Sequence, residues 1–356
     1  MYCDTRLGNV EKWYYTAPED AAMRIPDMLT QCVCYICVKY VKGEFAGQYK
    51  PIGTAFFVGV MVENYEFIYL VTAKHNLTKI YKLFDTFYLR LNDKKTGTMY
   101  VPVEKGKAAW TSFDNMDIDL AVLAVGGIDR ERFEHRAIPL DNFATSQVLL
   151  DQYIGLGDDV FAVGLFTGRA GTEKNIPIVR TGIISSMPEE PIRDGSKAYN
   201  AFLVELRSIG GVSGSPVFVY LDRHRATTTL IPHNQLSTYH FLGIIRGKWT
   251  MDQNLLQEQE EIDVALAYNK GESLNLGIAI VTPAEDLWHL IMNDESIKKR
   301  QDYVNDHRTS ETITEDSDMD VEDMDSGFTE LNFQTSLKKV SKKLLVAEPD
   351  ALKPKE

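Results

Sequence analysis

The 356-residue sequence predicts an all-β fold. Its middle part consists of short β-branched and aromatic runs broken by Gly, Asn and Asp, which is the pattern of strands joined by turns. Residues 65–71 and 86–91 alternate with a period of two, so each is expected to be a half-buried strand. The chain is 44% apolar, which suffices for a large core, and no internal repeat is evident. One folded unit of ~200–250 residues, typical of large all-β domains, fits this chain.

Two polar residues stand at strand ends in the first half of this unit. The apolar run that begins at Tyr69 ends at His75, and Asp119 stands at the mouth of an apolar strand that continues to Val125. Taken singly, each residue is more readily explained as a polar residue at a strand end or a turn. Asp117 lies two positions before Asp119 and is a rival carboxylate.

A small-residue turn, Gly210 to Pro216, lies between the apolar runs 201–206 and 217–220. Glycines let backbone N–H groups converge on one point because no Cβ stands in the way. The N–H groups of Gly211 and Ser213 would form an oxyanion hole beside the Ser213 hydroxyl. Alone, this turn is a moderate signal, since Gly-Ser-rich turns join strands in many β proteins.

The three polar residues follow one another in the order His75, Asp119, Ser213. A serine hydroxyl is a poor nucleophile and needs a base, and the base in turn needs an orienting carboxylate. The joint occurrence of the three in this order is much harder to explain by accident than any one of them. The sequence therefore predicts nucleophilic chemistry at Ser213.

Five features resemble, in order, motifs of one known family. Residues 53–58 resemble a glycine-opened first strand, residues 71–75 a T-A-x-H histidine motif and residues 119–123 a D-[LI]-A-[VL]-L aspartate motif. Residues 211–216 resemble a G-x-S-G-G-P nucleophile motif, and residues 242–245 and 276–280 resemble two closing strands. Segments 157–164 and 181–185 also fit strands of its second half. The chain resembles the serine proteases of the chymotrypsin fold, and among them the trypsin-like peptidases of the bacterial HtrA type. The resemblance covers roughly residues 28–295.

This resemblance implies two six-stranded antiparallel β-barrels, at about 28–140 and about 155–290, and a C-terminal helix at 283–291. It also implies a role for each site residue. His75 would be the general base, Asp119 would hold its ring and tautomer, and Ser213 would be the nucleophile. The backbone N–H groups of Gly211 and Ser213 would receive the oxyanion. The family's aspartate directly precedes its apolar strand, which favours Asp119 over Asp117.

Three positions depart from the family pattern. Ser215 stands where glycine is usual and adds a hydroxyl near the nucleophile, and Ala55 replaces a common glycine in the first strand, where it affects packing. Val212 takes the place of an aspartate that pairs with a freshly released N-terminal ammonium in proteases activated by cleavage. A valine cannot form that pair, so the site is expected to be preformed or switched in another way.

The family's primary pocket is walled by the residues just before the nucleophile and by the strand after Gly243. Here these stretches contain Arg207, Arg246 and Lys248. A basic side chain at the pocket floor would favour an acidic or polar residue before the scissile bond. Long basic side chains usually lie on surfaces, so the alternative that all three point to solvent stays open.

Charge and hydropathy bear on partners and location. The formal net charge of −13 argues against non-specific nucleic-acid binding, which draws most of its affinity from a basic surface. No run of ~18 apolar residues could span a bilayer, so no membrane partner is expected. Residues 1–20 lack the apolar core of a signal peptide, and a cytoplasmic location is predicted, unlike many HtrA relatives.

Four cysteines are present, and three of them, Cys32, Cys34 and Cys37, lie close together. In a strand, Cys32 and Cys34 would point to one face and Cys37 to the other, and no histidine lies near at a familiar metal-ligand spacing. Buried thiols are therefore favoured over a metal site, and reduced thiols suit the cytosol. No metal and no cofactor is expected.

The ends and one insertion differ in character from the rest. Residues 1–27 are expected to form an N-terminal arm, and residues 296–356 an acidic, disordered tail. HtrA proteins usually carry a PDZ domain after the protease, and this tail is too short to contain both an acidic linker and such a domain. The tail is either a solvating extension or a docking or autoinhibitory segment. The insertion 250–273 contains a possible amphipathic helix at 257–267 and is either a lid or a tolerated surface loop.

Two classes of function follow. The favoured one is a serine endopeptidase that acts on protein or peptide substrates through an acyl-enzyme. The alternative is a catalytically silent or partner-activated module of the same fold that binds or scaffolds. A regulatory partner or a homo-oligomer is compatible with both, by analogy with HtrA relatives.

Overall fold

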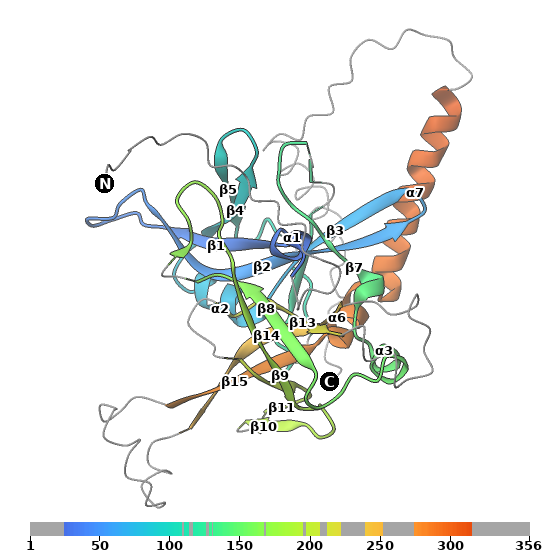
Figure 1. Cartoon of the computed structure of the whole chain (residues 1–356). Coiled ribbons are helices and arrows are strands. Elements are labelled where there is room, and N and C mark those ends of the chain that lie inside the picture. Colours follow the sequence, from blue (N-terminus) through green and yellow to red (C-terminus); the bar gives the residue numbers. More distant parts are fainter. Residues whose placement is uncertain are drawn as a thin grey trace, which may run out of the picture.

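A computed structural model describes the backbone of residues 25–314 except for residues 109, 114–116, 126–127, 130, 167–168, 195–196, 207–211, 222–238 and 252–273. The described part is mostly β-structure, as the sequence predicts, and its strands form two units that lie against each other (Figure 1). A segment with the short helices η1 (Leu140–Asn142) and α3 (Ser146–Asp151) links the two units. Residues 1–24 of the arm predicted at 1–27 lie outside the described residues, as does the helix predicted at 257–267; the short helix α1 (Asp27–Thr30) begins at the end of the predicted arm.

The first unit is a seven-stranded sheet. Its strands are β1 (Val33–Lys39), β2 (Tyr49–Val62), β3 (Tyr65–Thr72), β4 (Thr86–Asp93), β5 (Gly97–Glu104), β6 (Ala121–Ala124) and the short β7 (Ile138–Pro139). Six of them follow the order β5-β4-β1-β2-β3-β6, and β7 pairs in parallel with β2. Alternation places Ile68 and Leu70 of β3 and Phe87, Leu89 and Leu91 of β4 in one buried cluster inside this unit.

The second unit is a closed barrel with the strand order β12-β15-β14-β13-β8-β9. Its strands are β8 (Asp159–Gly164), β9 (Ile178–Ser186), β12 (Phe202–Glu205), β13 (Pro216–Tyr220), β14 (Tyr239–Met251) and β15 (Leu274–Pro283), and the hairpin of β10 (Ile192–Asp194) and β11 (Lys197–Tyr199) lies beside it. Closure removes the exposed edges of the sheet.

The predicted architecture of two antiparallel β-units is confirmed, but the first unit differs from the predicted six-stranded barrel in two ways: it has a seventh strand, β7, parallel to β2, and within the described part it does not close. Among the described residues no ladder joins β5 to β6, so the first unit is an open path of strands, whereas the second closes. β6 is only four residues long, and before it the chain makes a single isolated bridge, Thr111 to Val122. Such a short strand offers few backbone groups for a second neighbour.

An apolar cluster rich in aromatic side chains joins the two units. Phe56 of β2 packs against Phe241 of β14 across the two units with ring centroids 5.4 Å apart, and within the second unit Phe161 of β8 stacks on Phe218 of β13 at 5.2 Å. These four rings are 0–1% exposed. Aromatic pairs add to the stability gained by burying their area, so this contact fixes the position of one unit relative to the other.

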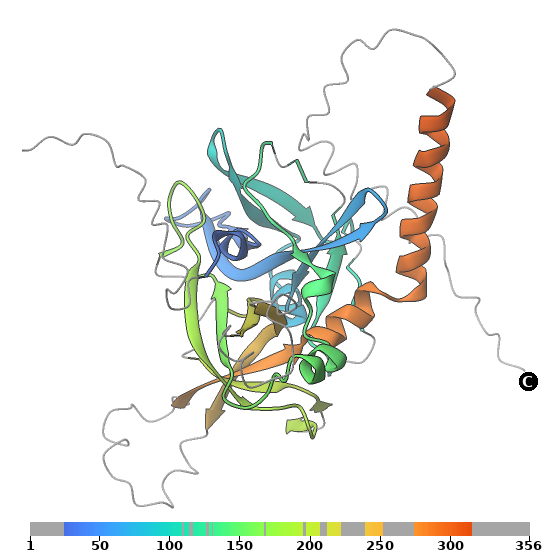
Figure 2. The same cartoon turned by 45° about the vertical axis from the view of Figure 1, so that its right-hand side comes forward.

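The C-terminal helix predicted at 283–291 is confirmed as α6 (Ala284–Ile291), and its apolar face is buried in the cluster between the units. The expectation of a disordered tail from residue 296 is wrong at its start, because α7 (Asp294–Thr314) follows directly. Val304 and Arg300 of α7 are 2% and 3% exposed, and Arg300 Nη1 donates to Tyr69 Oη at 2.7 Å. Figure 2 shows that the far part of α7 leaves the body of the molecule.

The three neighbouring cysteines are free and buried. The structure separates Cys32, which precedes β1 and packs with the cluster between the units, from Cys34, which faces the interior of the first unit. Burial raises the pKa of all three thiols above the usual range, so they are expected to be unreactive. Within the described ranges, no group of His, Cys, Asp and Glu side chains could hold a metal ion. None of the helices described is long and apolar enough to cross a membrane.

Candidate active site

His75 lies at the start of the helix α2 (Lys74–Tyr81), three residues after the end of β3. Ala73, the residue before the helix, has no side-chain acceptor for the free N–H groups of the first helical turn. The carboxylate of Asp119, 44 positions after His75, accepts one of them instead. Asp119 Oδ1 accepts the backbone N–H of His75 at 2.8 Å. A negative charge at a helix N-terminus satisfies a free N–H and is favoured by the helix dipole, so Asp119 fixes the backbone of His75 as well as its side chain.

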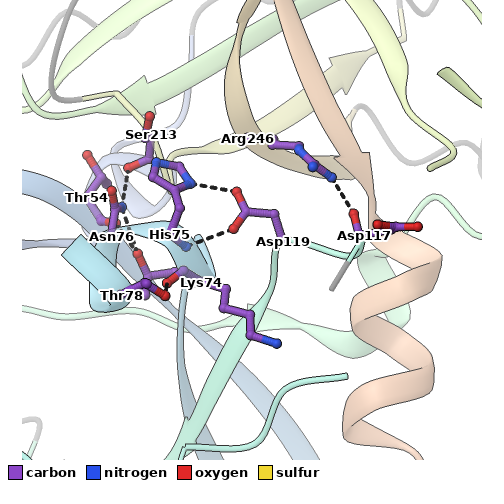
Figure 3. A network of polar contacts seen from close by, with 10 residues as sticks. Thr54, Lys74, His75, Asn76, Thr78, Asp117, Asp119, Ser213 and Arg246 are labelled. Atoms are coloured by element: carbon purple, nitrogen blue, oxygen red, sulfur yellow. Dashed lines mark hydrogen bonds and ion pairs between the residues drawn. The ribbon is translucent and has the colours of Figure 1, made fainter. Parts of the chain in front are cut away.

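The side chains of His75 and Asp119 form a close pair (Figure 3). His75 Nδ1 lies 2.6 Å from Asp119 Oδ2, and the two side chains are 27% and 10% exposed. An ionised carboxylate only accepts hydrogen bonds, so the pair places the ring proton on Nδ1 and leaves Nε2 as an acceptor. A histidine in this tautomer can take a proton at Nε2 and hold the resulting charge beside the carboxylate.

Asp117 takes a different place from Asp119. Its Oδ2 accepts the backbone N–H of Ala198 at 3.2 Å, and its backbone oxygen accepts a hydrogen bond from Arg246 Nη1. Figure 3 shows Asp117 on the far side of Asp119 from His75. Of the two carboxylates that the sequence offers, Asp119 is the one in contact with His75.

Ser213 lies in the turn that leads into β13. Its backbone oxygen accepts hydrogen bonds from Thr54 N of β2 at 3.3 Å and from Asn76 Nδ2 of α2 at 3.0 Å. The next residue, Gly214, donates its N–H to Ile245 O of β14 at 2.9 Å. The turn is thus held from both units at once, beside the residue that follows His75 (Figure 3).

A buried polar chain supports this turn. Thr72 Oγ1 donates to Thr54 O at 2.8 Å and accepts from Asn76 Nδ2 at 3.3 Å, and both threonines are fully buried. Thr54 Oγ1 in turn accepts the N–H of Leu165, directly after β8, at 3.0 Å. The sequence motifs did not identify Thr54, Thr72 and Asn76 as site residues. Their only sequence signal is that they are polar residues within or next to the matched motifs. Satisfied buried networks of this kind fix a unique arrangement.

The structure brings together His75 of α2, Asp119 just before β6 and Ser213 in the turn before β13, so each residue comes from a different segment of the chain. Among the described atoms, the Ser213 hydroxyl makes no hydrogen bond to the His75 ring. In sites without bound substrate such hydrogen bonds are often long or poorly aligned. Gly211, the other expected donor of the oxyanion hole, lies outside the described residues.

The three basic residues expected near the substrate pocket differ in their positions in the structure. Arg207 lies outside the described residues, and Lys248 is exposed on β14. The guanidinium of Arg246 lies 3.6 Å from the centroid of the Tyr199 ring and donates to Asp117 O. Arg246 therefore tethers the segment just before Asp119, a positioning role that sequence reasoning did not foresee.

The residues that depart from the family pattern are all buried. Val212 is 6% exposed and belongs to the apolar cluster inside the second barrel, so its surroundings suit a valine and not the ion pair of a cleaved zymogen. Ala55 packs inside the first unit. Ser215 is fully buried, and its hydroxyl has no hydrogen-bond partner among the described residues.

No protein-family model matches the sequence, and no characterised protein matches it at a significant level. The solved structures similar to this chain include the MamO protease domain from Magnetospirillum magneticum, with 15% identity and a TM-score of 0.40 over 73% of this chain and 95% of the other. The active form of the Rv3671c protease from M. tuberculosis has 16% identity and a TM-score of 0.38 over 77% and 93%. The human heparin binding protein has 10% identity and a TM-score of 0.41 over 76% and 93%. Similarities at this level carry no information about activity.

Proposed function

We propose that this chain is a serine endopeptidase in which Ser213 is the nucleophile, His75 the general base and Asp119 the residue that orients the base. The observation that carries the proposal is the His75–Asp119 pair at 2.6 Å, with the same carboxylate also on the backbone N–H of His75. The turn that carries Ser213 is held by Asn76, the residue after His75 in α2.

The proposed reaction has two halves. Ser213 Oγ attacks the carbonyl carbon of a peptide bond while its proton moves to His75 Nε2, and the oxyanion that forms is received by the backbone N–H groups of Ser213 and Gly211. The C–N bond then breaks, and His75 returns the proton to the leaving amine. Water, activated by His75, hydrolyses the acyl-enzyme and frees Ser213.

The second candidate is a module of the same fold that binds or scaffolds without turnover, or that needs a partner to become active. One observation favours it: the Ser213 hydroxyl has no hydrogen bond to the His75 ring among the described atoms. In this candidate, a partner or substrate would have to reposition the Ser213 side chain to complete the pair. We also predict a cytoplasmic location, to which the free thiols of Cys32, Cys34 and Cys37 are suited.

Covalent labelling with a fluorophosphonate separates these candidates. The full chain is expected to be labelled at Ser213, because the reagent reacts with an activated serine and needs no knowledge of the substrate. The variants Ser213→Ala and His75→Ala are expected to keep the fold, checked by circular dichroism, and to lose labelling. Absence of labelling in the unmodified chain, with and without candidate partners, would favour the binding module. Full labelling of His75→Ala would show that the base is misassigned.

A further inference from the structure

Two consecutive residues of α2, His75 and Asn76, lie beside the turn that carries Ser213 (Figure 3). Asn76 Nδ2 donates to Ser213 O at 3.0 Å, a bond that joins the first unit to the second. The helix itself is anchored in the first unit, because Leu77 and Ile80 are buried in the apolar cluster inside that unit. A contact that fixes Asn76 against Ser213 therefore also fixes the position of His75 relative to Ser213.

The hydrogen bonds around the Asn76 side chain have one consistent direction. Ser213 O can only accept. Thr72 Oγ1 donates its single proton to Thr54 O at 2.8 Å, so it is also an acceptor toward Asn76 Nδ2, at 3.3 Å. The place between these two acceptors needs a group with two protons to donate. A side-chain amide has two, a hydroxyl has one and a carboxylate has none, so an asparagine matches this place in chemistry as well as in distance.

Two glycines leave the space in which the Asn76 amide lies. A Cβ added at Gly214 would lie 3.2 Å from Asn76 Nδ2, and a Cβ added at Gly53 would lie 3.2 Å from the same nitrogen and 3.4 Å from Cγ. Gly214 has φ +87°, which favours glycine in any case, whereas Gly53 in β2 does not have a left-handed φ. The backbone of Gly53 therefore tolerates a side chain, and it is the amide of Asn76 that a side chain there would meet.

This arrangement bears on reactivity because a nucleophile and its base have to be aligned closely. Catalytic groups must be held within about 0.5 Å of their productive geometry by residues that are themselves fixed. The base and the nucleophile here belong to different units, and packing between units alone leaves the turn free to shift as a whole. The Asn76 amide ties the backbone of Ser213 directly to the helix that carries His75, so the alignment of the two is set locally.

We propose that Asn76 is a positioning residue for the reaction at Ser213, and that position 53 is a glycine in order to leave room for its amide. The inference rests on the proposed function, because it concerns the reactivity of the same serine. Asn76 transfers no proton in this role. It acts through the backbone of Ser213, which it holds at a fixed place relative to the ring of His75.

The test is a double-mutant cycle on the rate of fluorophosphonate labelling of the full chain. Asn76→Ala is expected to lower the maximal labelling rate by about 10-fold, which corresponds to the loss of one hydrogen bond. Gly53→Ala is expected to lower it by about 3- to 10-fold, because the added Cβ displaces the amide from Ser213 O. The three atoms nearest to that Cβ all belong to the Asn76 side chain, so the double variant is expected to react at the rate of Asn76→Ala.

Two further variants separate positioning from a purely structural role. Asn76→Asp keeps the shape of the side chain and removes both donors, so it is expected to lose at least as much rate as Asn76→Ala. Thr78→Ala is the matched control, because its exposed hydroxyl donates within the same helix, to Lys74 O at 3.1 Å, and it is expected to leave the rate unchanged. The pH midpoint of labelling, which reports the base, is expected to stay the same in all variants. Circular dichroism checks that each variant is folded.

A folded Asn76→Ala variant that is labelled as fast as the unmodified chain would overturn the proposal. Additive losses in the double variant would overturn it too, because Gly53 would then act independently of Asn76. A shifted pH midpoint would show that Asn76 acts on the base and not on the position of Ser213. Absence of labelling in the unmodified chain contradicts the peptidase and this inference together, whereas labelling that Asn76→Ala leaves intact contradicts this inference alone.

Discussion

Replacing Asp119 by asparagine is expected to lower the rate of fluorophosphonate labelling of Ser213 by roughly 10⁴-fold at pH 7, by the magnitude known for the same change in a Ser-His-Asp triad. An asparagine amide can donate to His75 Nδ1, which drives the ring proton to Nε2, the atom that has to accept the proton of Ser213. The carboxylate also holds the His75 backbone N–H at 2.8 Å, a bond that the amide oxygen of asparagine can keep. The loss is therefore expected in reactivity and not in folding.

Asp117→Asn is the matched control, because it removes the same charge two residues away. The side chain of Asp117 accepts the N–H of Ala198, and its backbone oxygen, which binds Arg246, is unchanged by the substitution. Labelling is expected to change by less than about 10-fold, consistent with a charge that is not in contact with the base. A fall as large as that of Asp119→Asn would show that the roles of the two carboxylates are reversed or shared.

The predicted strands and the three motif residues could be found from the sequence because their signals are local. Alternation along residues 65–71 identifies β3 whatever its neighbours are. The support of the nucleophile turn could not be found in this way. Asn76 Nδ2 meets Ser213 O across 137 positions of sequence, and only the packing of the two units brings them together.

The polar and acidic composition of residues 296–356 does not indicate helix α7, because the helix packs on the rest of the molecule through only a few positions. Its buried positions, Arg300 and Val304, are four residues apart and lie on one side of the helix. By its residue type Arg300 makes the segment more polar, although its guanidinium is buried against Tyr69 and the end of α6. An arginine whose stem packs and whose head finds acceptors contributes to the interface in a way that hydropathy does not register.

Replacing Gly214 by alanine is expected to lower the stability of the fold strongly. Gly214 has φ +87°, and an alanine Cβ there would lie 2.3 Å from Thr54 O and 2.7 Å from Thr72 Oγ1. The backbone of β2 cannot move aside without breaking the polar chain that runs through Thr72. A left-handed alanine and a clash with fixed backbone together are expected to lower the free energy of unfolding by about 3–5 kcal/mol, seen as a fall in Tm of roughly 10 °C.

Gly157→Ala separates the cost of the left-handed backbone conformation from the cost of the clash with β2. Gly157 has φ +85°, almost the same as Gly214, but nothing lies within 4 Å of the position of an added Cβ. It is expected to cost only about 1 kcal/mol, for the backbone conformation alone. The difference between the two variants in chemical denaturation therefore measures the contact between the nucleophile turn and β2. Equal costs would mean that the turn is free to move away from Thr54, and Ser213 would then not be held in place relative to His75 by this contact.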